Sequence, residues 1–295
     1  FFWSFENRNG IFPDVDSRYK FALMQVVNTI ADDTTPPIDA AFYVLDPTDL
    51  NRPESHVPYP LEMVRALSPN HWSMMELRDR IDLPILQKCY SAFSPLSADW
   101  LDFRNELHMT NDKDLFFETA TTGLLPLFEG KTIWQYSHTL SAPQYWLDQR
   151  AFDDRLRSKE IFRMAQDLAV KQSEAKHHMN SVRFDRESLR LGFREIASDT
   201  NERTLIFALL PRQIGVGHKV TFAATKRYTL DPEGHVTTVP LSPLRMLFAL
   251  AWFNAVVVDW LARFMIQISV SQTYLYRLPT PQPSDIEILT IADYS

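Results

Sequence analysis

Residues 124–136 read Leu-Leu-Pro-Leu-Phe-Glu-Gly-Lys-Thr-Ile-Trp-Gln-Tyr, an apolar opening followed by a turn and a polar segment. The apolar opening ends at Pro126, and Glu129-Gly130 supplies the turn. Because glycine has no Cβ, the backbone at such a point can turn tightly or approach a partner closely. Lys131 and Tyr136 follow the turn, so we expect this stretch to form the entrance to a binding surface. A turn with only a structural role would use the same residue types.

The chain has 295 residues, enough for two domains of ordinary size. Its single cysteine, Cys89, excludes an internal disulfide and a cysteine-based zinc site and favours the reducing cytoplasm. Residues 1–5 do not read as a signal peptide and indicate the middle of a longer protein. The longest apolar run, 246–258, is shorter than the roughly 20 residues that cross a bilayer, so we expect a buried helix and no membrane partner.

Charge is distributed unevenly along the chain. The formal net charge of -7 argues against binding nucleic acid, whose phosphates attract lysine and arginine. However, residues 150–230 contain 16 Lys+Arg and 10 Asp+Glu, a balance of +6, which leaves 14 and 27, or -13, for the rest. This central positive segment favours a DNA-binding surface, although a solvated helix face has the same composition.

Periodicity and turn residues predict the order of the elements. The strands are expected at 2–8 and 18–27, joined through Asn9-Gly10, and at 39–45, 101–109, 189–197, 204–210 and 218–230. The helices are expected at 61–67, 73–81, 84–93, 151–176 and 243–265. Residues 182–190 fit a helix or a strand equally well, Gly215-Val216-Gly217 is expected to be a loop, and 231–234 is expected to be a turn. Together these elements predict an α+β fold with a domain boundary near residue 120.

Several stretches resemble, in the same order, adenine-specific N6 DNA methyltransferases of the type IIG and type ISP restriction-modification and BREX phage-defence kind. Residues 124–136 are similar to the family pattern Pro-Leu-Tyr-x-Gly-Lys-x-Ile-x-x-Tyr at the entry to the target recognition domain. Residues 106–112 resemble a Met-Thr-Asn-Asp segment just upstream, and 194–211 resemble the block Arg-x-Ile-Ala-x-x-Thr-Asn-x-Arg-Thr. Residues 250–259 and 278–281 resemble the closing Leu-Leu-Asn-Ser helix and Leu-Pro-x-Pro, with Asn254-Ala255 in place of Asn-Ser.

The resemblance implies three parts. Residues 1–50 would be the last hairpin of the methyltransferase catalytic domain, 51–120 a helical connector, and 121–295 a target recognition domain with a mixed or antiparallel sheet and packed helices. The parent enzyme would use S-adenosylmethionine, methylate adenine in double-stranded DNA, and work with a missing N-terminal methyltransferase domain and with other restriction or phage-defence subunits. Gly10-Ile11-Phe12-Pro13 resembles the motif whose aromatic ring stacks on the flipped adenine, which assigns that role to Phe12. Core packing is the alternative for Phe12.

The catalytic motifs of such an enzyme are missing from these residues. The chain lacks the glycine-rich loop for S-adenosylmethionine, and Thr35-Pro36-Pro37-Ile38 lacks the polar and aromatic residues that flank the two prolines in the catalytic turn. We therefore expect this chain to bind no cofactor and no metal and to be inactive alone. The alternatives are a non-enzymatic DNA specificity module, a protein-interaction domain, and a metal-dependent nuclease built on Glu129, Lys131 and Asp112 or Asp114.

Lysines and arginines of the recognition region are expected to neutralise DNA phosphates, and a few of them, with Gln or Asn side chains, to read base edges in the major groove. The candidate DNA-binding residues are Lys131, Arg150, Arg155, Arg157, Lys159, Arg183, Arg186, Arg190, Arg194, Arg203, Lys226 and Arg227.

Overall fold

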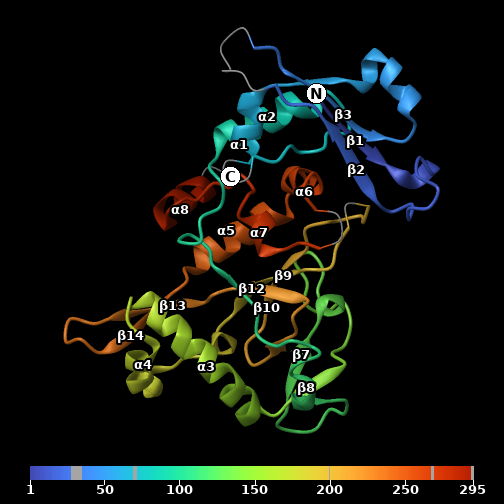
Figure 1. Ribbon diagram of the computed structural model, residues 1–295. Coiled ribbons are helices and arrows are strands. Elements are labelled where there is room, and N and C mark those ends of the chain that lie inside the picture. The colour runs from blue at the N-terminus through green and yellow to red at the C-terminus, as the bar shows by residue number, and fades with distance from the viewer. Residues whose placement is uncertain (28–34, 69–71, 199, 267–268, 294–295) are drawn as a thin grey trace. The chain divides into compact units, whose positions relative to one another are not determined.

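The fold is α+β, as the sequence predicts, and its sheets contain both parallel and antiparallel pairs (Figure 1). The computed structural model describes residues 1–27, 35–68, 72–198, 200–266 and 269–293. The chain divides into two compact units, Phe1–Pro95 and Leu96–Ser295.

Unit 1 contains one four-stranded sheet with the strand order β2-β1-β3-β4. The predicted N-terminal hairpin is confirmed: β1 and β2 pair antiparallel, and the chain leaves β1 through a short turn that ends at Gly10, whose φ is 71°. β3, also predicted, pairs parallel with β1. Phe5, Ala41 and Val44 form the core of this sheet. The strands are β1 Phe2–Glu6, β2 Lys20–Met24, β3 Ile38–Val44 and β4 Val57–Tyr59.

Two of the three helices predicted in unit 1 are present, as α1 (Leu61–Leu67) and α2 (Asp82–Ala92). The helix predicted at 73–81 is wrong. The carboxylate of buried Asp82, the first residue of α2, accepts hydrogen bonds from the backbone N–H groups of Arg78 (3.1 Å) and Asp79 (2.9 Å). These bonds hold residues 78–82 in a turn that leads into α2.

Unit 2 contains two four-stranded sheets and a two-stranded ribbon. The first sheet has the order β10-β9-β12-β5, with β5 Phe103–Arg104, β9 Arg190–Arg194, β10 Phe207–Leu210 and β12 Val220–Ala223. The second has the order β11-β7-β8-β6, with β6 Phe116–Phe117, β7 Leu125–Phe128, β8 Tyr145–Leu147 and β11 Gly215–Val216. The ribbon pairs β13 (Lys226–Leu230) with β14 (Val236–Pro240).

These strands confirm part of the predicted pattern. The pair expected around residue 200 is present as antiparallel β9 and β10, although Asp199 of the predicted turn lies outside the described residues. The single strand expected at 218–230 is two strands in different sheets. Of the strand expected at 101–109, β5 is present, and Leu107 forms an isolated bridge with Gly217. Residues 215–216, expected to be loop, form β11 and pair parallel with β7. Residues 182–190, which fit a helix or a strand, form neither over their whole length. Asp185–Glu187 are a short 3-10 helix, and Arg190 begins β9.

The first sheet of unit 2 is buried on both faces. Because successive side chains of each strand point to opposite sides, the two faces pack into two different clusters. On one face, an aromatic cluster joins Phe193 to Phe207 with 5.1 Å between ring centroids, and Phe207 to Phe253 of α5 with 4.7 Å. On the other face, Val220 and Phe222 belong to a core cluster that includes Phe128, Ile133, Ala208, Leu210, Ile214 and Val216. The strand β9 is therefore central to unit 2.

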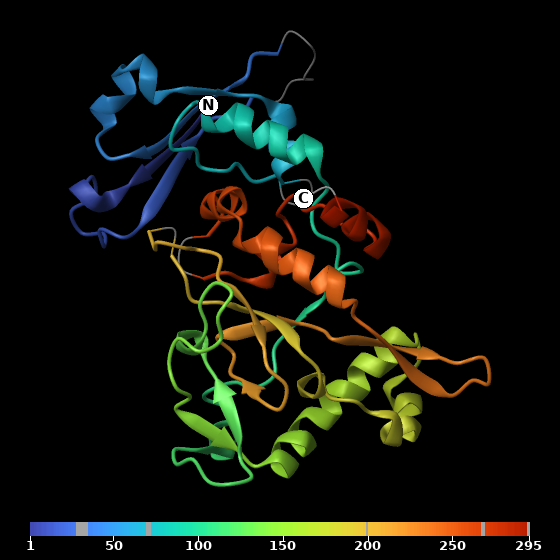
Figure 2. The same ribbon diagram turned by 180° about the vertical axis from the view of Figure 1, so that it is seen from behind.

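The helices of unit 2 are α3 Gln149–Asp167, α4 Gln172–Ala175, α5 Pro243–Asn254, α6 Val256–Arg263, α7 Gln272–Leu275 and α8 Asp285–Asp293. α3 follows β8 directly and extends to the β13–β14 ribbon (Figure 2). The helix expected at 151–176 ends at Asp167 and is followed by the short α4.

The single helix expected at 243–265 is broken. Ala255 has extended dihedral angles, and α5 and α6 bend by 62°. The side chain of buried Asn254 accepts a hydrogen bond from Phe207 N (3.0 Å) and donates one to Phe207 O (2.9 Å), while Asp259 accepts from Leu205 N (2.7 Å). These bonds fix the helix pair to the chain that enters β10. No single helix in the described ranges is long and apolar enough for a membrane span, and α5 and α6 pass that test only as a bent pair.

The division between the two compact units follows Pro95, and the domain boundary expected near residue 120 lies within unit 2. Residues 96–105 join unit 2 through hydrogen bonds with the end of the chain, including Leu96 N to Leu278 O (3.1 Å) and Trp100 Nε1 to Pro283 O (3.2 Å). They also supply β5 to the first sheet.

A buried ion pair connects the parts of unit 2. Arg190 on β9 is completely buried, and its Nη1 donates to Glu106 Oε1 at 2.6 Å. Arg190 Nη2 donates to Ile214 O (2.7 Å), and Glu106 Oε2 accepts from Val216 N (2.9 Å). Lys159 on α3 donates to the backbone oxygen of Glu106. Burial raises the pKa of Glu106, and Arg190 opposes that effect.

We expect Arg190→Ala to lower the free energy of unfolding by about 3–5 kcal/mol, because it leaves the Glu106 carboxylate buried without its counter-charge. Urea unfolding followed by tryptophan fluorescence at pH 7 measures this loss. The double variant Arg190→Met, Glu106→Gln should recover part of it, since Gln keeps an acceptor for Val216 N. Arg150→Ala, at an exposed site, should change stability by less than about 0.5 kcal/mol. A loss below about 1 kcal/mol for Arg190→Ala would contradict this account.

Candidate nucleic-acid interface

The segment after β7 is fixed by its own hydrogen bonds. Ile133 is completely buried, and so is Thr132, whose hydroxyl donates to Glu129 O at 2.7 Å. Leu140 N donates to Thr132 O (3.0 Å), which closes the loop. Two further bonds attach the loop to the chain around β10: Gln135 Nε2 to Leu205 O (2.9 Å) and Tyr136 N to Phe207 O (2.9 Å). The side chains that point outward therefore stand on a rigid support.

A groove of about 300 Å³ lies beside this loop, and we call it the basic groove; its lining residues are Glu129, Gly130, Lys131, Arg194, Ile196 and Lys219. Three segments meet here because Gly217 N donates to Phe128 O (2.9 Å) and Glu195 N donates to Lys219 O (3.0 Å). A Cβ at Gly130 would lie 3.0 Å from Arg194 Cγ and 3.5 Å from Lys219 O. The absence of a side chain at Gly130 thus permits a close approach, as the sequence predicted. The groups that approach it belong to Arg194 and Lys219 of the same chain.

The basic groove holds three cations and one carboxylate. Lys131 lies 3.2 Å from Glu129 Oε2 and donates to the exposed amide of Gln144. Arg194 donates through Nε to Ile196 O (2.8 Å), and its guanidinium lies 5.9 Å from the ring centroid of Trp134. Within the described part of the chain, the ammonium of Lys219 has no hydrogen bond or ion pair. Burial lowers the pKa of Arg194, which stays charged at neutral pH.

Two of the candidate DNA-binding residues, Arg186 and Arg190, are buried, and a third, Lys226, is partly buried between two carboxylates; this corrects their assignment. Arg190 pairs with Glu106, as described above. Arg186, which is 2% exposed, donates through Nε and Nη2 to the two carboxylate oxygens of Asp153 at 2.8 and 2.7 Å. The side chain of Lys226 is 9% exposed and lies 3.1 Å from Asp185 and 3.2 Å from Glu160. Since a buried charge needs its partner, none of these cations is available to a phosphate.

Other candidates are at the surface but already have partners. Arg155 pairs with Asp112, Arg157 lies 3.5 Å from Asp154, Lys159 donates to Glu106 O, Arg183 donates to its neighbour Val182 O, and Arg227 lies 3.3 Å from Asp99. Arg150 is exposed and Arg203 is half-buried, and among the residues described neither makes an ion pair. The structure brings only Lys131 and Arg194 of the predicted set together in the groove.

Lys219 was missed as an individual candidate. The sequence signal was Gly217, two residues earlier, where a Cβ would lie 2.6 Å from Met109 Sδ. This close packing, with the β11–β7 pair, carries Lys219 to the groove. The place of Lys219 at the groove depends on the parallel pairing of β7 with β11, nearly 90 residues later in the chain, which local periodicity does not reveal.

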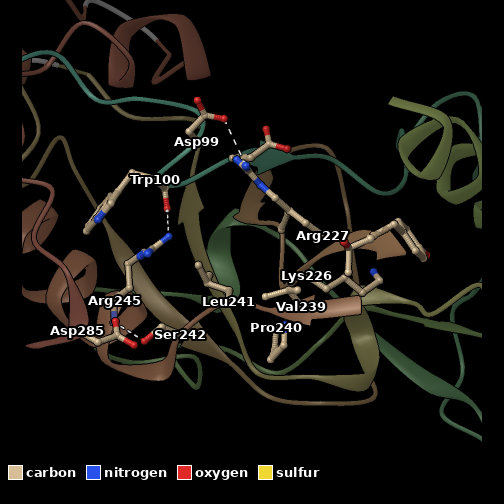
Figure 3. A pocket seen from close by; sticks show the side chains of 14 residues that line it. Asp99, Trp100, Lys226, Arg227, Val239, Pro240, Leu241, Ser242, Arg245 and Asp285 are labelled. Carbon is tan, nitrogen blue, oxygen red and sulfur yellow. Dashed lines mark hydrogen bonds and ion pairs between the residues drawn. The ribbon is translucent and has the colours of Figure 1, made fainter. Parts of the chain in front are cut away.

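A second pocket of unit 2, of about 530 Å³, is lined by Lys226, Arg227 and Arg245 but also by Asp99, Asp102 and Asp285 (Figure 3). Arg227 Nη2 donates to Ala98 O (2.8 Å), and Arg245 Nη1 donates to Trp100 O (3.2 Å). The charges of this pocket balance. It is therefore a weaker phosphate site than the basic groove.

Phe12 of unit 1 lies at the surface, with 49% of its area exposed. Buried Asn7 holds the loop that carries it: Asn7 Nδ2 donates to Phe12 O (3.0 Å) and Val15 O (2.7 Å), and Phe12 N donates to Asn7 Oδ1 (2.8 Å). The ring makes a T-shaped contact with Phe21, with 4.8 Å between the ring centroids. Core packing, the alternative for Phe12, does not fit this exposure.

The carboxylates needed by a nuclease are not gathered in the basic groove. Among the described residues that line it, Glu129 is the one acid, and Asp112 is occupied by Arg155 and by His108 N (2.7 Å). In the part of the chain that the structure describes, the acidic and histidine groups close enough to share an ion are Asp231, Glu233 and His235 in the turn of the β13–β14 ribbon. The Asp231 carboxylate there accepts the backbone N–H groups of Glu233 (3.1 Å) and His235 (2.7 Å).

No protein-family model matches the chain, and no curated protein sequence matches it either. The relation to adenine-specific DNA methyltransferases therefore depends on the motifs quoted above and remains a prediction.

Lys226 pairs with the carboxylates of Asp185 and Glu160, and Asp185 is expected to make the free energy of unfolding depend on pH. Burial alone would raise the pKa of Asp185, but Lys226, Arg163 and the N–H and hydroxyl of Thr225 outweigh it and hold the pKa well below its ordinary value of 3.8. A depressed pKa in the folded state adds stability above the unfolded pKa, and this stability is lost as the pH falls.

Asp185→Asn should therefore reduce the free energy of unfolding at pH 7, and the variant should lose less stability than the unaltered protein between about pH 4 and pH 2. Urea unfolding at a series of pH values measures both effects. Asp154→Asn, at an exposed carboxylate, serves as the matched control and should follow the unaltered protein. Parallel curves for Asp185→Asn and the unaltered protein would refute the assignment.

Proposed function

We propose that this chain is the DNA target recognition region of an S-adenosylmethionine-dependent N6-adenine DNA methyltransferase of restriction-modification or phage defence. The observation that carries the proposal is the basic groove, where Lys131, Arg194 and Lys219 meet against one carboxylate. Much of the remaining positive charge of residues 150–230 is neutralised by ion pairs within unit 2. The groove is thus a place where three cations gather on a rigid support, whereas exposed Arg150, Lys171, Lys176 and Arg212 lie outside it.

Each groove residue has a role that fits double-stranded DNA. Lys131 and Lys219 carry flexible ammonium groups that suit phosphates as point charges. Arg194 is held by Ile196 O and by the Trp134 ring, which pre-positions its guanidinium for a phosphate or a guanine edge. Gln144, exposed beside Lys131, offers an amide of the kind that reads adenine. Backbone binding and base reading are thereby combined in and beside one groove.

The catalytic part of the proposal rests on the motif resemblance. A methyltransferase domain preceding these residues would supply S-adenosylmethionine and the catalytic turn, in the cytoplasm and together with other restriction or phage-defence subunits. Phe12 would stack on the flipped adenine. Its exposure and the Asn7 clamp support that role, because an aromatic ring must be both accessible and rigidly placed to replace the lost base stacking.

The triple variant Lys131→Ala, Arg194→Ala, Lys219→Ala should bind a random-sequence 30-base-pair duplex much more weakly than the unaltered chain. Its dependence of log K on log salt should be shallower by about 2–3, since each lost phosphate contact removes about 0.9 from the slope. Fluorescence anisotropy at a series of salt concentrations measures both quantities, and circular dichroism checks the fold.

The triple variant Lys171→Ala, Lys176→Ala, Arg212→Ala is the matched control, because it removes the same charge from exposed sites outside the groove. It should keep most of the affinity and the slope. Equal losses in the two triple variants, or binding by the unaltered chain that does not respond to salt, would contradict the proposed interface.

Phe12→Ala tests the catalytic part in a protein that contains the methyltransferase domain. Transfer of a labelled methyl group to DNA should fall by an order of magnitude or more, duplex binding should persist, and Phe12→Tyr should retain most of the activity because the ring is kept. Unfolding should change little, since the ring is half exposed. Full methyl transfer by Phe12→Ala would exclude the stacking role.

A further inference from the structure

Tyr136 occupies a backbone conformation that its side chain disfavours. Its φ is 63°, in the left-handed region where a Cβ is strained and where glycine or asparagine is the usual residue. The turn leaves no freedom here: Trp134 N donates to Ser137 O (2.8 Å), Ser137 N donates to Trp134 O (3.0 Å), and Tyr136 N donates to Phe207 O (2.9 Å). A tyrosine at this position therefore destabilises the fold relative to glycine.

The ring of Tyr136 does not compensate for that strain. It is 60% exposed, and within the described residues it has no aromatic, cation–π or side-chain hydrogen-bond partner. Three of the other four described non-glycine residues with positive φ differ in this respect, and the fourth, Ala169, follows the C-terminus of α3, where a left-handed residue is usual. Tyr43 has Lys20 4.3 Å from its ring centroid, Trp72 has Arg65 at 4.9 Å, and Gln213 accepts a hydrogen bond from Arg186. Strain without a compensating contact indicates a functional residue.

The position of Tyr136 indicates the function. The residue lies on the same rigid loop as Lys131, and two residues from Trp134, whose ring contacts the guanidinium of Arg194. We propose that Tyr136 stacks its ring on the face of a nucleobase in DNA bound along the basic groove. This inference rests on the proposed function. The ligand is a base that is unstacked from at least one neighbour, as at a deformable step, because only then is a base face accessible to a side chain.

Photo-crosslinking tests this contact with the full chain. The probe is a random-sequence 30-base-pair duplex in which thymidine is partly replaced by 5-iododeoxyuridine, a base that crosslinks to stacked aromatic side chains on irradiation. We expect peptide mapping to find the crosslink at Tyr136. It should be lost in Tyr136→Ala and Tyr136→Gly, and the affinity of both variants should fall roughly tenfold. Tyr136→Phe should retain most of the affinity, and Phe162→Ala, which removes another exposed ring of unit 2, should change neither readout.

Tyr136→Gly also separates the functional role from a structural one. Glycine relieves the strain, so this variant should melt at the same temperature as the unaltered chain or higher while it loses the crosslink. A lower melting temperature for Tyr136→Gly would overturn the inference. So would salt-sensitive binding in which Tyr136→Ala keeps its affinity and the crosslinks map to other residues. Both results would leave the proposed DNA interface at the basic groove standing. Absence of duplex binding by the unaltered chain would overturn both proposals.

Discussion

The organisation of unit 2 depends on one buried ion pair, between Arg190 in the central strand β9 and Glu106 in the segment that follows β5. The pair is shielded from water, so each charge needs all the partners that the fold supplies. Arg190 reaches Ile214 O and Glu106 reaches Val216 N, which fixes β11 against β9. Because β11 pairs with β7, the same interaction also sets the position of the loop that carries the basic groove.

Internal pairing also determines which positive charges are left for a ligand. The sequence shows a central segment with excess lysine and arginine, but Arg186, Arg190 and Lys226 are used to neutralise carboxylates of the same unit. At the basic groove, Lys131, Arg194 and Lys219 keep a local excess of positive charge at the surface. A local charge excess on a rigid support explains how a chain with a net charge of -7 can still offer a surface for nucleic acid.

Local patterns predicted the elements better than the site. The N-terminal hairpin, β9 with β10, and α1 and α2 follow from alternation, turn residues and periodicity. The break at Ala255 accompanies hydrogen bonds between Asn254 and Phe207, 47 residues earlier in the chain, which no local pattern records. At 73–81 the competing interaction is local, because the Asp82 carboxylate accepts from the N–H groups of Arg78 and Asp79. Lys131 and Arg194 were expected at a surface, whereas the burial of Arg190 depends on Glu106, 84 residues earlier in the chain.

The most direct test of the central claim is a lysine footprint, in which acetic anhydride labels the chain with and without a saturating random-sequence duplex and mass spectrometry measures each site. The account predicts that DNA lowers the acetylation of Lys131 and Lys219, leaves exposed Lys171 and Lys176 unchanged, and finds Lys226 poorly reactive in both states because its carboxylate partners bury it. Protection of Lys171 and Lys176 without protection of Lys131 and Lys219 would show that DNA lies elsewhere and would contradict the account.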